Sequence, residues 1–416
     1  MPFSSRTGDW TPFIDALFTA TSASCVTGLV VVDTYTHWSL FGQLVVLALI
    51  QVGGLGFMTF VMISGLLLGK TIHVQERRLV MQSSGTLELS GMVRMIKRIV
   101  FGTVLFESLG AILLATQFVP EMGWGTGIYY SIFHSISAFC NAGFDLMGCY
   151  EPFSSLTRYV ENPVVSLTIC GLIIVGGLGF LVWGDIAKNR FHLRSYRLHS
   201  KITISMTVIL LLGGSLLFYL FEKDHLLADA SPLKSVLASF FAAVTPRTAG
   251  YNTLPVGELS QSSSLLTIIL MFIGGGTGST AGGIKVTTFV VLAMTVLSSA
   301  QQKSQVSVFK RQLDPGITRQ ASAIASIYLA MILLCTLIIC ALQPYSLRDV
   351  LLEVVSAIGT VGLTAGITPV LDPISKLLLI LLMYGGRLGA LSLALAFAER
   401  KDVVPLNRPV EKILIG

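Results

Sequence analysis

Long, uninterrupted apolar runs dominate the chain. They include Leu40–Gly69, Ile202–Phe221 and Leu377–Phe397, and each exceeds the length of about 18 residues at which an apolar run predicts a membrane-spanning helix. Because the apolar residues are continuous rather than alternating, the runs do not predict the strands of a membrane barrel. The pattern predicts seven full spans and therefore an all-α polytopic membrane protein.

A short polar stretch that ends in glycine occurs four times along the chain. The copies read ALFTATSASCVTGL, SIFHSISAFCNAGF, SFFAAVTPRTAGY and EVVSAIGTVGL, and their glycines are Gly28, Gly143, Gly250 and Gly362. A glycine cluster follows each copy, in the segments 51–57, 174–180, 272–278 and 383–389. The polar stretch and the glycine cluster recur together at a similar distance from each other, which indicates one structural unit that is used four times.

Each polar stretch follows a helix of only half the length of a span. These half-helices are predicted at Ile14–Thr21, Ile128–Phe139, Leu233–Val244 and Arg348–Ala357. About ten residues of helix reach about 15 Å, half of a bilayer, and irregular backbone at that depth is tolerated where it lines a cavity. We predict four tandem helix–pore-loop–helix repeats around a central pore, with bounds at residues 1–70, 71–190, 191–311 and 312–416. The first helix of repeat one is absent from the pattern, so we expect a shortened N terminus or an internal start.

The four polar loops are candidates for a cation selectivity filter. Glycine adopts positive φ readily, which lets backbone carbonyls face a common axis, where they can replace the water around a cation. The C-terminal ends of the half-helices add partial negative charge. The candidate residues are Val26, Thr27, Gly28, Asn141, Ala142, Gly143, Thr248, Ala249, Gly250, Thr360, Val361 and Gly362. Close helix packing is the alternative, and it is favoured for the glycine clusters of the second helices.

A second glycine-rich segment, GGGTGSTAGGIK at 274–285, lies inside an apolar run. Each glycine costs about 1 kcal/mol in a helix relative to alanine, so we predict a loop that interrupts the helix. The candidate gate residues are Gly274, Gly275, Gly276, Thr277, Gly278, Ser279, Thr280, Gly282, Gly283, Lys285 and Arg387. An arginine within a span usually faces the bundle interior; snorkelling to the surface is the alternative for Arg387 and Lys285. We expect Arg247 to brace the outer loop of the filter.

Charge is scarce and unevenly placed. Only 12% of residues are charged, against about 25% in soluble domains. Basic residues gather in alternate connections, at Lys70–Arg98, Lys188–Lys201 and Lys303–Arg319 and in the C-terminal tail, which predicts that these segments are cytoplasmic rather than bound to nucleic acid. The other connections carry Asp33, Asp145, Glu151, Glu161, Asp224, Asp229 and Asp372, and an acidic face attracts cations. The six histidines are dispersed, so no enzyme site is predicted, and His134 is expected to pack within its half-helix.

With these pore loops and the glycine-rich segment, the chain resembles the Trk/Ktr/HKT superfamily of potassium transporters, most closely its bacterial Ktr membrane subunit. The resemblance implies potassium uptake with K⁺ at the filter residues, often with Na⁺ as coupling ion. It also implies a homodimer in the lipid of the bacterial inner membrane, resting on a cytoplasmic ring of nucleotide-binding regulatory subunits. A Trk-like or HKT-like cation channel without sodium coupling is the main alternative. An alternating-access carrier and a membrane-embedded enzyme are less consistent with four pore loops.

Overall fold

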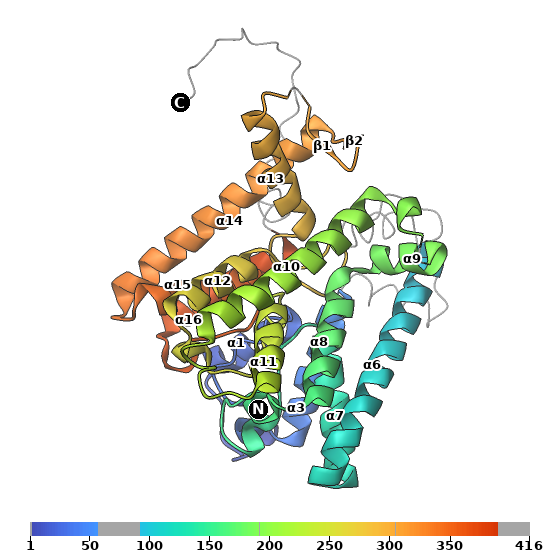
Figure 1. Cartoon of the computed structure of the whole chain (residues 1–416). Coiled ribbons are helices and arrows are strands. Elements are labelled where there is room, and N and C mark those ends of the chain that lie inside the picture. The colour runs from blue at the N-terminus through green and yellow to red at the C-terminus, as the bar shows by residue number, and fades with distance from the viewer. Residues whose placement is uncertain (1, 57–91, 191, 304, 390–416) are drawn as a thin grey trace.

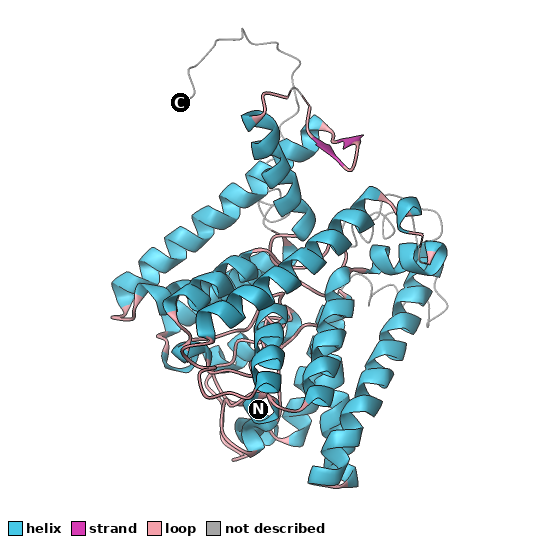
Figure 2. Ribbon diagram, in the orientation of Figure 1, coloured by secondary structure: helices cyan, strands magenta, loops and turns pink. Residues whose placement is uncertain are grey.

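Helices form almost all of the regular structure in the computed structural model, which describes residues 2–56, 92–190, 192–303 and 305–389 (Figures 1 and 2). The α-helices are α1 (Phe13–Ser24), α2 (Thr34–His37), α3 (Leu40–Leu55), α6 (Met92–Met122), α7 (Trp124–Phe139), α8 (Pro163–Leu178), α9 (Phe180–Asn189), α10 (Leu198–Glu222), α11 (Pro232–Val244), α12 (Gln261–Phe272), α13 (Val286–Ala300), α14 (Pro315–Leu342), α15 (Leu347–Gly359) and α16 (Pro373–Leu388). One small antiparallel pair joins β1 (Ser307–Val308) to β2 (Arg311–Gln312), with Ser307 opposite Gln312. The fold is therefore the all-α membrane architecture that the apolar runs predicted.

The same order of elements recurs along the chain. A long helix is followed by a shorter helix, an irregular loop and a second helix in α6–α7–α8, in α10–α11–α12 and in α14–α15–α16. At the N terminus the order begins directly with the short helix α1, which precedes α3. The short helices α1, α7, α11 and α15 contain the four predicted half-helices; they are called half-helices below. The residue bounds of the repeats themselves remain a prediction.

Local sequence signals explain where the half-helices begin. Ser231 caps α11 because its hydroxyl accepts a hydrogen bond from the Lys234 N–H at 3.2 Å, and Pro232 follows at the first helical position. Ser346 caps α15 in the same way through the Asp349 N–H, also at 3.2 Å. These caps satisfy backbone groups that a helix of little more than three turns leaves free at its start.

The described residues contain part of the predicted membrane spans. Within the described residues, three helices are long and apolar enough to cross a membrane: Ile96–Met122, Leu198–Glu222 and Gly316–Leu342. A fourth span is present if α8 and α9, which meet at a bend, are counted as one. The described parts of three second helices end at glycines: α3 at Gly56, α8 at Gly179 and α16 at Gly389, with φ values of 83°, 98° and 88°. The number of seven spans stays a prediction. The rest of the predicted spans Leu40–Gly69 and Leu377–Phe397, like most of the basic segment Lys70–Arg98, lies outside the described residues.

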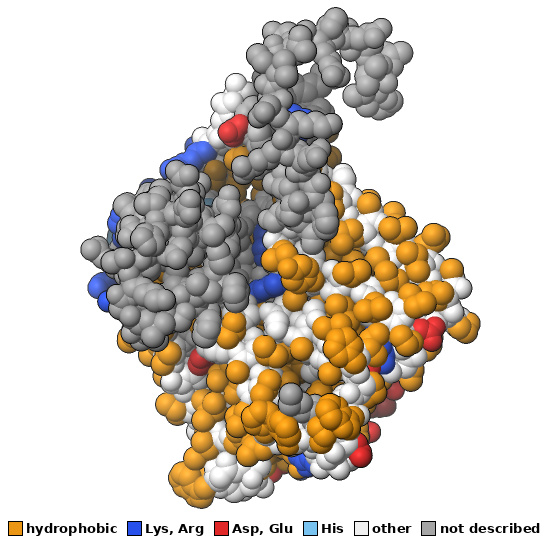
Figure 3. Space-filling model, turned by 180° about the vertical axis from the view of Figure 1, so that it is seen from behind, with side chains coloured by type: hydrophobic (Ala, Val, Ile, Leu, Met, Phe, Trp, Pro, Cys, Tyr) orange, Lys and Arg blue, Asp and Glu red, His pale blue; other side chains and the backbone are white. Residues whose placement is uncertain are grey.

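The long helices carry a hydrophobic outer surface. Large apolar side chains are exposed on α6 (Phe101, 70%), on α10 (Leu212, 64%) and on α14 (Leu337, 69%). Figure 3 shows hydrophobic side chains across the lower and right parts of one face, with most of the visible Lys and Arg toward its upper left. A continuous apolar surface of this kind would be a liability in water and is what contact with lipid requires. The chain is a multi-pass membrane protein.

Candidate functional site

The four loop glycines form a closed ring. A Cβ atom placed on Gly28, Gly143 or Gly250 would lie 2.5 Å from a carbonyl oxygen of the next loop: Ala142, Ala249 and Val361, respectively. A Cβ atom on Gly362 would lie closer still to the Thr27 carbonyl oxygen. The fourth loop therefore contacts the first, and the four loops form a closed circle. No side chain fits between neighbouring loops at this level. Gly28, Gly143, Gly250 and Gly362 are called the glycine ring below.

The backbone around the ring has the same unusual conformation in all four loops. The ring glycines have φ values of 92°, 68°, 83° and 94° in chain order, and the residue two positions earlier is also left-handed: Val26 (56°), Asn141 (58°), Thr248 (66°) and Thr360 (51°). A left-handed non-glycine residue costs about 1–2 kcal/mol, and a β-branched residue such as Val26 is seldom found there. Because the strain recurs at equivalent positions, it belongs to the architecture of the site.

Hydroxyl groups at the ends of the half-helices hold the loops. The Gly28 N–H donates to Ser22 Oγ at 3.1 Å, and the Gly362 N–H donates to Ser356 Oγ at 3.0 Å. In the second loop the Ser137 hydroxyl instead donates to the Phe144 carbonyl at 2.8 Å. These bonds explain the serine six residues before the glycine in three copies of the pattern.

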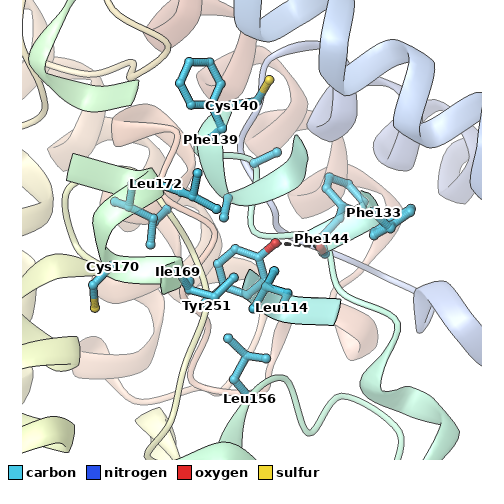
Figure 4. Close-up of a cluster of buried hydrophobic side chains, with 14 of the residues drawn as sticks. Leu114, Phe133, Phe139, Cys140, Phe144, Leu156, Ile169, Cys170, Leu172 and Tyr251 are labelled. Carbon is cyan, nitrogen blue, oxygen red and sulfur yellow. Dashed lines mark hydrogen bonds between the residues drawn. The ribbon is translucent and has the colours of Figure 1, made fainter. Parts of the chain in front are cut away.

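The third loop lacks that serine and uses other groups. The hydroxyl of Thr245, one position later, donates to the Tyr251 carbonyl. Tyr251 is fully buried, and its own hydroxyl donates to the Phe144 carbonyl at 3.0 Å, which ties the third loop to the second (Figure 4). The four loops thus share one backbone conformation, but serine hydroxyls support three of them and Thr245 and Tyr251 support the third loop.

The glycine clusters of three second helices provide close packing. A Cβ atom on Gly53, Gly176 or Gly386 would overlap the carbonyl oxygen of Ser24, Phe139 or Ile358, respectively. Each of these carbonyls ends, or lies next to the end of, the half-helix of the same repeat. The clusters therefore let the second helices touch the half-helix ends, as the packing alternative proposed.

An ion pair closes the bundle between its first and last helices. The Lys376 Nζ of α16 lies 2.8 Å from the Asp15 Oδ1 of α1, and both side chains are largely buried, at 11% and 16% exposed. The pair joins the same two repeats that the contact between Gly362 and the Thr27 carbonyl joins. The first and last repeats are thus joined by two contacts, the ion pair and the contact between the loops.

The predicted interruption is present between the end of α12 at Phe272 and the start of α13 at Val286. Residues 274–283 form an irregular segment, called the gate loop below. Its backbone runs along the end of α8: the Gly276 N–H donates to the Gly177 carbonyl at 2.8 Å, and the Phe180 N–H donates to the Gly278 carbonyl at 2.8 Å. At this point α8 and α9 meet at an angle of 94°. Sequence reasoning missed this second break, because Gly179 belongs to a cluster that reads like its neighbours.

The gate loop lies against the ends of two half-helices. The Thr280 hydroxyl donates to the Phe139 carbonyl of α7 at 3.2 Å. A Cβ atom on Gly282 would overlap the Thr360 hydroxyl, and one on Gly283 would lie 3.1 Å from the Gly359 carbonyl oxygen. The gate loop therefore contacts the ends of α7 and α15, where the second and fourth polar loops begin.

Arg387 points into the bundle. Its guanidinium, in the last turn of α16, donates to the Thr280 carbonyl of the gate loop and to the Gly53 and Gly54 carbonyls at the end of α3, the last at 3.3 Å. A cation at a helix C terminus is stabilised by the partial negative charge there. Lys285 also turns back, because its Nζ donates to the Ala281 carbonyl at 2.6 Å. In this conformation neither side chain snorkels away from the gate loop.

Arg247 is buried, with 3% of its surface exposed, and its Nη1 has no hydrogen-bond partner among the described residues. Its contact with the neighbouring loop is made by its backbone, since Asn141 Nδ2 donates to the Arg247 carbonyl at 3.2 Å and to Thr248 Oγ1 at 3.3 Å. The expected brace between its side chain and the outer loop therefore remains a prediction.

Several buried oxygen atoms next to the ring lack donors. Thr27 Oγ1, Asn141 Oδ1 and Thr360 Oγ1 have no hydrogen-bond partner within the part of the chain that the structure describes. An unsatisfied buried polar atom typically costs about 1–3 kcal/mol, and each retains free lone pairs. Oxygen atoms of this kind, together with backbone carbonyls, are the ligands that a dehydrated monovalent cation requires.

Comparisons with known proteins point in one direction. The sequence profile of the TrkH family, described as a cation transport protein, matches residues 4–403. The potassium/sodium uptake protein NtpJ of Enterococcus hirae is 38% identical, over 100% of this chain and 92% of its own length. The Ktr system potassium uptake protein B of Bacillus subtilis is 39% identical, over 94% of this chain and 87% of its own length. The crystal structure of the potassium transporter TrkH from Vibrio parahaemolyticus has the same fold, with a TM-score of 0.73 at 19% identity, over 93% of this chain and 79% of that one.

Proposed function

Since the chain belongs to the TrkH family of cation transport proteins, with Ktr-type potassium uptake proteins among its close relatives, we propose that it is the ion-translocating subunit of a Ktr-type potassium uptake system. The observation that carries the proposal is the closed glycine ring with its four equivalent left-handed backbones. The family and its relatives are transporters, not enzymes.

The proposed pathway for K⁺ runs through the glycine ring. Carbonyl groups of the four loops, together with the free oxygens of Thr27, Asn141 and Thr360, would replace the hydration shell of the ion. The C-terminal ends of four half-helices stabilise positive charge at the same place. The gate loop and Arg387 lie on the inner side of the ring and would control the rate of passage.

Sodium dependence is part of the proposal. One relative carries the name potassium/sodium uptake protein, which supports Na⁺ as a coupling ion or as a second permeant ion. A Trk-like or HKT-like channel without sodium coupling would use the same ring. The two functions differ in whether external Na⁺ accelerates K⁺ uptake.

Potassium uptake into potassium-starved, uptake-deficient bacterial cells tests the function. We expect the chain to restore uptake when it is produced with a Ktr-type regulatory ring, and to do so faster with external Na⁺. Equal rates with and without Na⁺ would favour the uncoupled channel. Correctly inserted protein that gives no K⁺ uptake under any of these conditions would contradict the proposal.

We also propose a homodimer in the bacterial inner membrane whose basic segments face the cytoplasm and dock the regulatory ring. The name Ktr system, carried by several relatives, supports a complex with a further subunit. Lys188 in the last turn of α9 and Arg190, Arg194 and Arg197 between α9 and α10 are exposed, so they are available to such a partner.

Cysteine labelling from outside intact cells checks this orientation. We expect a cysteine at Ser195, in the exposed basic segment, to escape a membrane-impermeant thiol reagent, because the segment is cytoplasmic. Asp229→Cys, on the opposite side, is the matched control and should react, as Asp229 is exposed as well. Partly exposed Cys149 and Cys340 are replaced by serine in both variants. Strong labelling at Ser195, or at Ser304 outside the described residues, would overturn the topology.

A further inference from the structure

Two of the half-helices carry, at the same position, a buried side chain that accepts a hydrogen bond from the polar loop. His134 of α7 stands nine residues before Gly143, and Glu353 of α15 stands nine residues before Gly362. They are 0% and 1% exposed. Each accepts a hydrogen bond from the backbone N–H of the residue three positions after its ring glycine: Leu146 to His134 Nε2 at 3.3 Å, and Ala365 to Glu353 Oε1 at 3.1 Å.

The surroundings of His134 define its role. Because Nε2 accepts from the Leu146 N–H, Nδ1 must be the protonated nitrogen, and it lies 2.7 Å from the Tyr130 carbonyl, to which it donates. The imidazole is held in the neutral form by two backbone groups that approach it from opposite sides. Its ring also contacts Phe118, with centroids 5.7 Å apart, so the side chain has little freedom to move.

Glu353 performs the same task with a carboxyl group. Beyond the Ala365 N–H, it accepts from the Thr364 hydroxyl and, at Oε2, from the Thr368 hydroxyl at 2.7 Å. All of these donors lie in the segment that leaves the filter toward the outside. A buried carboxyl with three donors is a satisfied group, and it attaches this segment firmly to α15.

The other two repeats lack this support. Their equivalent residues are Thr19 and Phe241. The Thr19 hydroxyl donates to the Asp15 carbonyl of its own helix at 2.9 Å, and phenylalanine has no polar atom to offer. In the order of contacts around the ring, Gly143 and Gly362 are opposite each other, each lying between Gly28 and Gly250. The support is therefore present on two opposite sides of the ring.

We propose that His134 and Glu353 are positioning residues that determine cation selectivity by holding the outer segments of two opposite filter loops. This inference rests on the proposed function of the glycine ring. Each supported loop is attached to its half-helix just before the glycine by a backbone hydrogen bond, which in the second loop joins the Ala142 N–H to the Ser137 carbonyl at 2.8 Å. In the fourth loop the equivalent bond joins the Val361 N–H to the Ser356 carbonyl, also at 2.8 Å. Both loops are attached again three residues beyond the glycine. A loop held on both sides of its glycine keeps the carbonyls at a distance that suits K⁺, whereas a loop that lacks the second attachment can close around the smaller Na⁺.

Matched substitutions separate positioning from packing. His134→Phe and Glu353→Met keep bulk but remove the acceptor, while His134→Gln and Glu353→Gln keep an oxygen acceptor. We expect His134→Phe to lower the K⁺/Na⁺ uptake ratio about fivefold, the effect of one lost hydrogen bond. Glu353→Met, which removes the acceptor of three donors, should lower it at least as much, and the Gln pair should retain it. Thr19→Val, at the equivalent unsupporting position, is the control and should leave the ratio unchanged. Amide hydrogen exchange at Leu146 and Ala365 should become faster in the first pair alone.

Each outcome of this experiment bears on the inference. An unchanged K⁺/Na⁺ ratio in both acceptor-free variants would overturn it, as would an equal loss in the Gln variants. If Glu353→Met does not fold, the His134→Phe and His134→Gln comparison decides, because it preserves the aromatic contacts. Failure of the proposed function gives a different result from failure of this inference. If the glycine ring is not the filter, serine at the ring glycines leaves cation uptake unaltered, and the rate of amide exchange at Leu146 and Ala365 does not affect that result.

Discussion

Serine in place of any one of Gly28, Gly143, Gly250 and Gly362 is expected to lower K⁺ affinity or the K⁺/Na⁺ preference by about tenfold or more. The added Cβ atom would overlap a carbonyl oxygen of the next loop in every case, so the neighbouring carbonyls must move. The positive φ of each glycine adds a strain of about 1–2 kcal/mol for an L-residue, and 1.4 kcal/mol corresponds to a factor of ten in an equilibrium constant.

Concentration-dependent K⁺ uptake, measured with and without competing Na⁺, is the test of this prediction. Gly123→Ser is the matched control, because Gly123 also has a positive φ, of 81°, but a Cβ atom there meets nothing within 4 Å. Its uptake should equal that of the parent protein. Unaltered uptake kinetics in all four ring variants would show that the ring is not the filter.

Arg387→Ala, or deletion of part of the gate loop, is expected to raise the maximal K⁺ flux severalfold while leaving the K⁺/Na⁺ preference mostly intact. The guanidinium joins the gate loop to the end of α3, and its charge opposes cation passage in a setting of low dielectric constant. Loss of one to two hydrogen bonds of about 1 kcal/mol each shifts a closed–open equilibrium by about fivefold to thirtyfold.

Arg387→Lys separates the two contributions of the side chain. Lysine keeps the positive charge but cannot reproduce the planar fork that reaches two structural elements at once. If the hydrogen bonds from Arg387 to the gate loop and to α3 close the gate, the maximal flux of Arg387→Lys should resemble that of Arg387→Ala. If the positive charge closes the gate, the maximal flux should resemble that of the parent protein. Initial rates of Rb⁺ and Na⁺ flux into proteoliposomes provide the readout. Variants that lose selectivity at an unchanged maximal rate would place the gate loop within the filter.

Much of this site could be predicted from local sequence signals. The half-helices and the interruption at 274–285 lie where the polar stretches and glycines indicated, since capping residues and glycine runs act over a few neighbours. The sharp turn at Gly179 was not predictable in this way, because a glycine cluster of this kind also fits close helix packing. The turn is accompanied by the Phe180 N–H bond to Gly278, about 100 residues away in the sequence, and no local pattern contains such a contact.

The residues that support the four polar loops show the same limit of prediction from local sequence. The serines six residues before the ring glycines were visible as a repeated letter, whereas His134 and Glu353 are different residue types and share no letter. The two residues are equivalent because each places an acceptor atom next to the backbone N–H three residues after its ring glycine. A pattern search by residue identity does not detect it, and only the folded backbone reveals it.

The ion pair between Asp15 and Lys376 has a consequence for the order of assembly during synthesis. The two residues are 361 positions apart, so α1 leaves the ribosome and enters the membrane long before its partner helix exists. Contacts between distant parts of a chain form late, although the entropy of closing so long a loop grows only with the logarithm of its length. The contact between α1 and α16 is therefore the last part of the circle to form, and a chain that stops before α16 leaves the Asp15 carboxylate without its counter-charge.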